Sequence, residues 1–149
     1  MSLPAFQKLF QKDLDKLRKE IESYQNEAAI WQTAPGISNA AGNLCLHLVG
    51  NLNTFIGAEL GKTSYIRDRP LEFSLTGISK AELLTKIDET IAVVTAALGK
   101  LTEKQLTHLY PVVVFEEKMQ IGDMLTYLAT HLNYHLGQIN YHRRLMDKA

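Results

Sequence analysis

The residues of this chain best suited to chemistry are histidines near its C-terminal end. Residues 130–142 read THLNYHLGQINYH and contain three of the chain's five histidines. His131 and His135 are four residues apart, so a helix would place both imidazoles on one face, one turn apart. Such a pair can bind a divalent cation, or the two can be polar core residues that each need a hydrogen bond. Position 132 is leucine, so the glutamate of the HExxH metalloprotease pattern is absent.

A third histidine, on a different predicted helix, favours the metal interpretation. His47 lies in LCLHLVGNLNTFI, whose apolar residues spread around most of a helix, and its polar stripe consists of Asn43, His47, Asn51 and Thr54. Three neutral imidazoles from two helices can hold Zn²⁺ or a similar ion and leave one coordination position open. Asn51 and Gln138 lie near these histidines in sequence and are candidates for supporting a ligand or binding substrate.

The other reactive side chains are given structural roles. Cys45 points about 160° away from His47 on a helix, which predicts a core residue. His142 lies two turns beyond His135 and is expected at the end of a bundle, and His108 is expected in a solvated loop. No general base is evident, because Glu59 lies about 120° around the helix from His47.

A polar segment, residues 62–78, follows the second predicted helix and contains Arg67, Asp68, Arg69 and Glu72. We favour a surface salt-bridge cluster that holds a long connection in place. The alternative is that Arg67 or Arg69 binds the carboxylate of a substrate or cofactor through paired hydrogen bonds.

Four helical patterns dominate the chain, at residues 5–27, 38–61, 79–101 and 121–146, with apolar residues three and four apart. Residues 108–120, HLYPVVVFEEKMQ, lack that period and predict a short extended or irregular segment. Long helices with a long second connection predict an all-α four-helix bundle, formed by residues 1–149 as a single domain.

Composition excludes several classes of protein. The formal net charge is zero, which argues against a nucleic-acid partner. No apolar run is long enough to span a bilayer, and the first residues lack the order of a signal peptide. The single cysteine allows no internal disulfide, so a cytoplasmic location is expected.

Three segments together resemble the DinB-like superfamily, also called the DNA-damage-inducible B or YfiT-like group. They are LCLHLVGNLNTFI, YIRDRPLEF and THLNYHLGQINYHRRL, and the resemblance is to an uncharacterised branch and covers nearly the whole chain. It implies an up-down-down-up four-helix bundle with a crossover after the second helix. It also implies a metal site at His47, His131 and His135, and frequently a homodimer.

The resemblance implies two kinds of activity. Characterised relatives transfer low-molecular-weight thiols, such as bacillithiol and mycothiol, with the help of a divalent metal, and other relatives have only a hydrolase label. We therefore expect an enzyme that transfers such a thiol to an electrophile or hydrolyses a small molecule. Zn or Ni is the expected metal, with Fe as a third candidate. The alternative is a non-catalytic dimeric binding or stress-response protein with a structural or vacant metal site.

Overall fold

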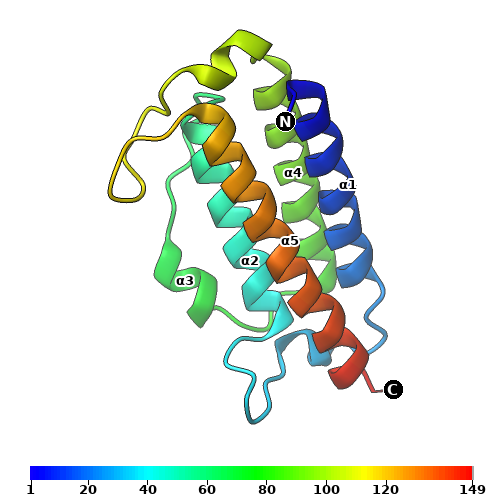
Figure 1. Ribbon diagram of the computed structural model, residues 1–149. Coiled ribbons are helices and arrows are strands. Elements are labelled where there is room, and N and C mark those ends of the chain that lie inside the picture. The colour runs from blue at the N-terminus through cyan, green and yellow to red at the C-terminus, as the bar shows by residue number, and fades with distance from the viewer. Residues whose placement is uncertain (149) are drawn as a thin grey trace.

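Four long helices form the bundle in the computed structural model, which describes residues 1–148 (Figure 1). They are α1 (Leu3–Glu22), α2 (Ala41–Leu52), α4 (Lys80–Gly99) and α5 (Ile121–Met146). Serine hydroxyls cap two of them: Ser2 Oγ accepts from the Ala5 N–H and Ser79 Oγ from the Glu82 N–H. The apolar residues that recur along each helix meet in one buried core. The predicted all-α bundle is confirmed.

The four long helices run in an up-down-down-up order. Gln7, near the start of α1, donates to the carbonyl of Leu98 at the end of α4, so these helices are antiparallel. Glu20, near the end of α1, pairs with Arg143 near the end of α5, so this pair is parallel. Figure 1 shows α2 and α4 running opposite to α1 and α5, with α2 beside α5.

The second helix is buried almost completely, as its all-round apolar pattern predicts. Every residue of α2 except Val49 is buried. The helix passes directly into a π-helical turn, η2 (Asn53–Ala58), so the single predicted helix over 38–61 consists of two forms. The amide of Asn53 donates to the Val49 carbonyl and to Thr90 Oγ1 of α4, which fastens this turn to the bundle.

The crossover after α2 is more ordered than predicted. It contains a short helix, α3 (Arg69–Ser74), whose cap is Asp68, which accepts the Leu71 N–H. Asn43 Nδ2 of α2 donates to the carbonyls of Glu72 and Leu75, at 3.0 and 2.8 Å. These bonds hold α3 against the outside of α2, on the left in Figure 1.

The irregular segment before α5 is a loop closed at its base, rather than a strand. A short 3₁₀ helix, η3 (Glu103–Thr107), precedes it, and a similar one, η1 (Glu27–Trp31), lies between α1 and α2. One antiparallel bridge joins Leu109 to Gln120, and the Tyr110 N–H donates to the Met119 carbonyl at 2.8 Å. We call residues 111–119 the hairpin loop. Within residues 1–148, no helix is both long enough and apolar enough to cross a membrane.

Candidate metal centre

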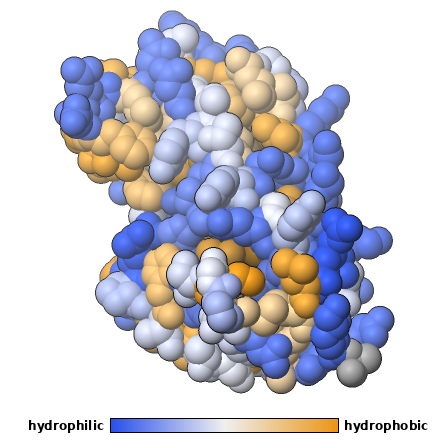
Figure 2. Space-filling model, turned by 60° about the horizontal axis from the view of Figure 1, so that its bottom comes forward, coloured by the Kyte–Doolittle hydropathy of each residue, from blue (hydrophilic) through white to orange (hydrophobic). Residues whose placement is uncertain are grey.

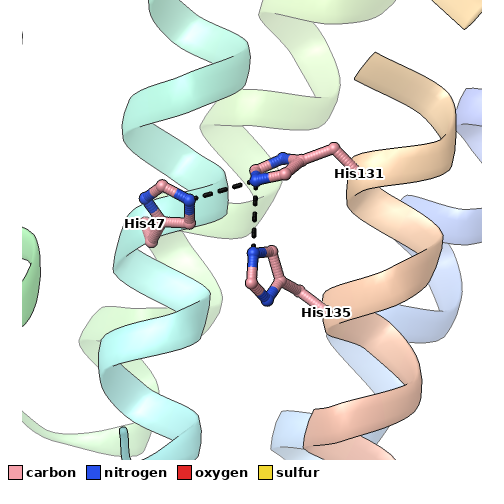
Figure 3. A group of neighbouring side chains, drawn as sticks. All are labelled: His47, His131 and His135. Carbon is pink, nitrogen blue, oxygen red and sulfur yellow. Dashed lines mark hydrogen bonds between the residues drawn. The ribbon is translucent and has the colours of Figure 1, made fainter. Parts of the chain in front are cut away.

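Three histidine side chains converge between α2 and α5, in the arrangement that their spacing predicts. Figure 3 shows His47 reaching from one helix and His131 and His135 from the other, with their rings pointing toward a common point. Nε2 of His131 lies 3.2 Å from Nε2 of His47 and 3.2 Å from Nε2 of His135. One nitrogen from each residue lies within 4.8 Å of the other two. His47 is buried, and the other two are partly buried.

The partners of the outer ring nitrogens determine which nitrogen is free to bind a ligand. Nδ1 of His47 lies 3.0 Å from Oε1 of Glu72, and a carboxylate can only accept, so this Nδ1 carries the proton. Nδ1 of His135 donates in the same way to the amide oxygen of Gln138, at 2.7 Å. Both residues therefore direct an Nε2 lone pair toward the common point, which is the state that a metal ligand requires.

The third histidine is held neutral by its surroundings. Burial is the largest cause that lowers the pKa of His131 to about 4, and the neighbouring His135, His47 and Arg67 contribute to the same shift. Its Nδ1 is buried and has no hydrogen-bond partner among the described residues. A proton on Nε2 of His131 could be donated to Nε2 of His47 or to Nε2 of His135, but not to both. Hydrogen bonds among the three histidines therefore cannot satisfy all three Nε2 atoms.

The trio fits a divalent ion. Metal–nitrogen bonds of about 2.0–2.1 Å at a tetrahedral ion place neighbouring ligand nitrogens about 3.3 Å apart. The two observed separations of 3.2 Å lie close to that value. Three neutral imidazoles suit Zn²⁺, Ni²⁺ or Fe²⁺ and leave room for a further ligand.

The prediction of a surface salt-bridge cluster is wrong for Glu72, which is not at the surface. Glu72 is buried, and its carboxylate accepts from His47 and twice from Arg67, through Nε at 2.8 Å and Nη2 at 3.0 Å. Burial by itself would raise the pKa of Glu72, but the hydrogen bonds from His47 and Arg67 outweigh it and leave the pKa below the usual value. A carboxylate–histidine pair of this kind orients a metal ligand and raises its basicity.

Gly50 makes room for this carboxylate. A Cβ built on Gly50 would lie 1.8 Å from Oε2 of Glu72, so only glycine allows Glu72 to approach α2 at this position. Sequence reasoning placed Glu72 in a surface cluster, without linking it to His47, and did not single out Gly50. The available signal was that a ligating histidine needs an acceptor for its second nitrogen, and the crossover carries carboxylates.

The other predicted site residues differ in their positions. Gln138 is hydrogen-bonded to His135, one of the three candidate ligands. Asn51 is buried one turn beyond His47, and its Oδ1 has no hydrogen-bond partner among residues 1–148. Arg67 is committed to Glu72, whereas Arg69 is exposed and lies over the ring of Phe73, 5.5 Å from its centroid.

The residues that were assigned structural roles lie outside the centre. Cys45 is fully buried, and burial raises the pKa of its thiol to about 12. His142 is buried at the end of the bundle, where its Nδ1 accepts from the Tyr24 hydroxyl at 2.6 Å and its Nε2 donates to the Gln32 carbonyl at 2.8 Å. His108 is exposed beside the hairpin loop.

Comparison with known proteins agrees with this architecture. The family model described as "Protein of unknown function (DUF1572)" matches residues 3–149. The crystal structure of a DinB-like protein from Bacillus cereus ATCC 10987 superposes with a TM-score of 0.76 and 19% identity, covering 97% of this chain and 92% of that chain. No curated protein matches in sequence. The DinB-like fold that the sequence predicted is therefore confirmed, and the chain belongs to the DUF1572 family.

Proposed function

We propose that this protein is a metal-dependent enzyme that holds a divalent ion with His47, His131 and His135 and transfers a low-molecular-weight thiol to an electrophile. The observation that carries the proposal is the convergence of three Nε2 atoms, in which Nε2 of His131 lies 3.2 Å from each of the other two. The lone pairs of those other two are fixed by Glu72 and Gln138. A divalent ion bound there would lower the pKa of a thiol or a water molecule in its open position. Zn²⁺ and Ni²⁺ are the first candidates and Fe²⁺ the third.

The lack of a free general base favours a thiol over water as the nucleophile. Hydrolysis needs a base to move protons during attack and departure, whereas a thiolate attacks without further deprotonation. Glu72 is the carboxylate bonded to His47, but it already accepts from His47 and Arg67. It is therefore a poor proton acceptor, and hydrolysis of a small molecule is the second candidate function.

We assign the recognition of a carboxylate on the thiol to Arg69. Arg67 was the other candidate for this role, but its Nε and Nη2 already donate to the buried carboxylate of Glu72. Arg69 is exposed and is held over Phe73, whose ring lies 5.0 Å from that of His47. Its guanidinium can thus meet an anionic group on a ligand that reaches the histidines.

The test begins with metal content. Purified wild-type protein and His47→Ala are loaded with Zn²⁺, Ni²⁺ or Fe²⁺, dialysed and measured by elemental analysis. We expect about one ion per wild-type chain and a loss in the variant, because two imidazoles remain. The loaded protein is then assayed with small thiols and an alkylating electrophile, and Arg69→Gln should raise KM for a carboxylated thiol more than for 2-mercaptoethanol.

Three results would overturn the proposal. Equal metal content in wild type and His47→Ala would show that the ion binds elsewhere. No metal in the wild type under any loading condition would favour the alternative, a non-catalytic bundle whose histidines are polar core residues. Metal binding with ester or amide hydrolysis but no thiol transfer would replace the first candidate function by the second.

A further inference from the structure

An aromatic ring that reaches the surface lies against each of the three histidines. Phe73 of α3 lies 5.0 Å from the ring of His47, and Tyr134 lies 5.3 Å from that of His135. Tyr127 stacks on His131 with centroids 6.1 Å apart. These aromatic residues are 36%, 65% and 39% exposed, so they are not part of the core.

A fourth ring comes from the hairpin loop. Phe115 meets Tyr127 edge to face, with centroids 4.7 Å apart, although it is 45% exposed and lies in an otherwise projecting segment. In Figure 2 the lobe at the upper left, on the side of the hairpin loop in Figure 1, has a hydrophobic flank beneath a hydrophilic tip. A notch separates this lobe from the body of the molecule.

The two segments that supply Phe115 and Phe73 are fixed to the bundle at their bases. The hydroxyl of Tyr110, a fully buried residue, donates to the Phe55 carbonyl at 2.6 Å and anchors the start of the hairpin loop. Asn43 anchors α3 through two backbone carbonyls. The rings are therefore held in place by tertiary contacts, and we call Phe73, Phe115, Tyr127 and Tyr134 the aromatic rim.

We propose that the aromatic rim binds the apolar, preferably aromatic, body of a ligand whose polar head reaches the three histidines. This inference rests on the proposed metal site and adds the class of substrate: an electrophile that carries an aryl or comparably flat apolar group. Ring faces and edges bind such groups by stacking and by removing apolar surface from water. The exposed rings then have a function that packing alone does not supply.

The test compares two ligands that share a metal-binding head. Imidazole and 4-phenylimidazole are titrated into Co²⁺-loaded protein, and the visible spectrum of the ion reports binding at the open position. Burial of about 60 Å² of phenyl surface corresponds to about tenfold in Kd. We therefore expect 4-phenylimidazole to bind about tenfold more tightly than imidazole.

The variants Phe115→Ala and Tyr127→Ala should each reduce this preference at least about threefold, because each removes one wall of the rim. The matched control is Tyr141→Ala. Tyr141 is an exposed tyrosine of α5, the helix that also carries Tyr127, and its ring lies against Arg144 instead of a residue of the aromatic rim. Taking the ratio of the two ligands within each variant removes any change in metal affinity itself.

The outcomes separate this inference from the proposed function. Failure of the wild type to bind Co²⁺ or Zn²⁺ would overturn both. Metal binding with equal affinity for the two ligands, or a preference that survives in both rim variants, would overturn the aromatic rim alone. A change in oligomeric state in the rim variants with an unchanged preference would assign these rings to a protein interface and likewise refute the inference.

Discussion

Replacing Glu72 by glutamine should weaken metal binding without removing a ligand. The carboxylate accepts three hydrogen bonds, one from His47 and two from Arg67, and lies in a site where its side chain is only 7% exposed. Glutamine keeps the shape but offers a single acceptor oxygen and no charge. His47 then becomes a weaker base, and the cation of Arg67 lies uncompensated beside the metal.

The expected loss of metal affinity in Glu72→Gln follows from both effects. Loss of an outer partner of a ligating histidine typically costs 10–100-fold in metal affinity, or about 1.4–2.7 kcal/mol. The loss of the negative charge adds to this, so we expect the upper half of that range. Kd for Zn²⁺ is measured by competition with a chromophoric chelator, after circular dichroism has established that each variant is folded.

A matched control and a second variant make the result decisive. Glu20→Gln also removes a carboxylate from an arginine pair, at 2.7 Å from Arg143, but the hydrogen-bond partners of Glu20 are Asn140 and Arg143 and none of the three candidate ligands. It should leave Kd within about twofold of wild type. Gly50→Ala should weaken binding about tenfold or more, because its Cβ would displace the Glu72 carboxylate. Wild-type Kd in folded Glu72→Gln and Gly50→Ala would refute the reasoning.

Two further predictions concern the stability and reactivity of the bundle. Tyr24→Phe removes the donor to the buried Nδ1 of His142 and should lower the free energy of unfolding by about 1–3 kcal/mol in urea titration. Its metal affinity should not change, and unaltered stability would contradict the role given to that bond. Cys45 should resist iodoacetamide at pH 8 in the native protein and react in urea, because burial raises the pKa of its thiol to about 12 and blocks access. Rapid labelling of the native chain, followed by mass spectrometry, would show that the core around α2 opens readily.

The three histidines could be predicted from the sequence because their positions obey the period of a helix. His131 and His135 are one turn apart, and His47 belongs to the polar stripe of a helix that is otherwise apolar all round. A polar residue on such a helix must meet a partner inside the molecule. The superposition of the chain on a DinB-like protein, with a TM-score of 0.76, agrees with the predicted helical bundle.

Glu72 could not be assigned in the same way, because its environment depends on residues that are distant in sequence. The segment around it is polar and contains proline, a composition typical of a solvated loop. It becomes buried because Gly50 leaves a space on α2, Asn43 binds the backbone of α3, and His47 and Arg67 compensate the charge. No pattern within residues 62–78 contains that information.

The sequence by itself determined the four long helices, the inward faces of the two that carry His47, His131 and His135, and the absence of helical period before α5. These properties depend on interactions within a few residues, which a local pattern records. Only the tertiary structure decided that α2 and α5 are neighbours, that α3 folds over His47, and that the hairpin loop brings Phe115 to Tyr127. Such contacts join segments 12 to 84 residues apart, and they form because the whole core buries more apolar surface in this arrangement than any local segment could.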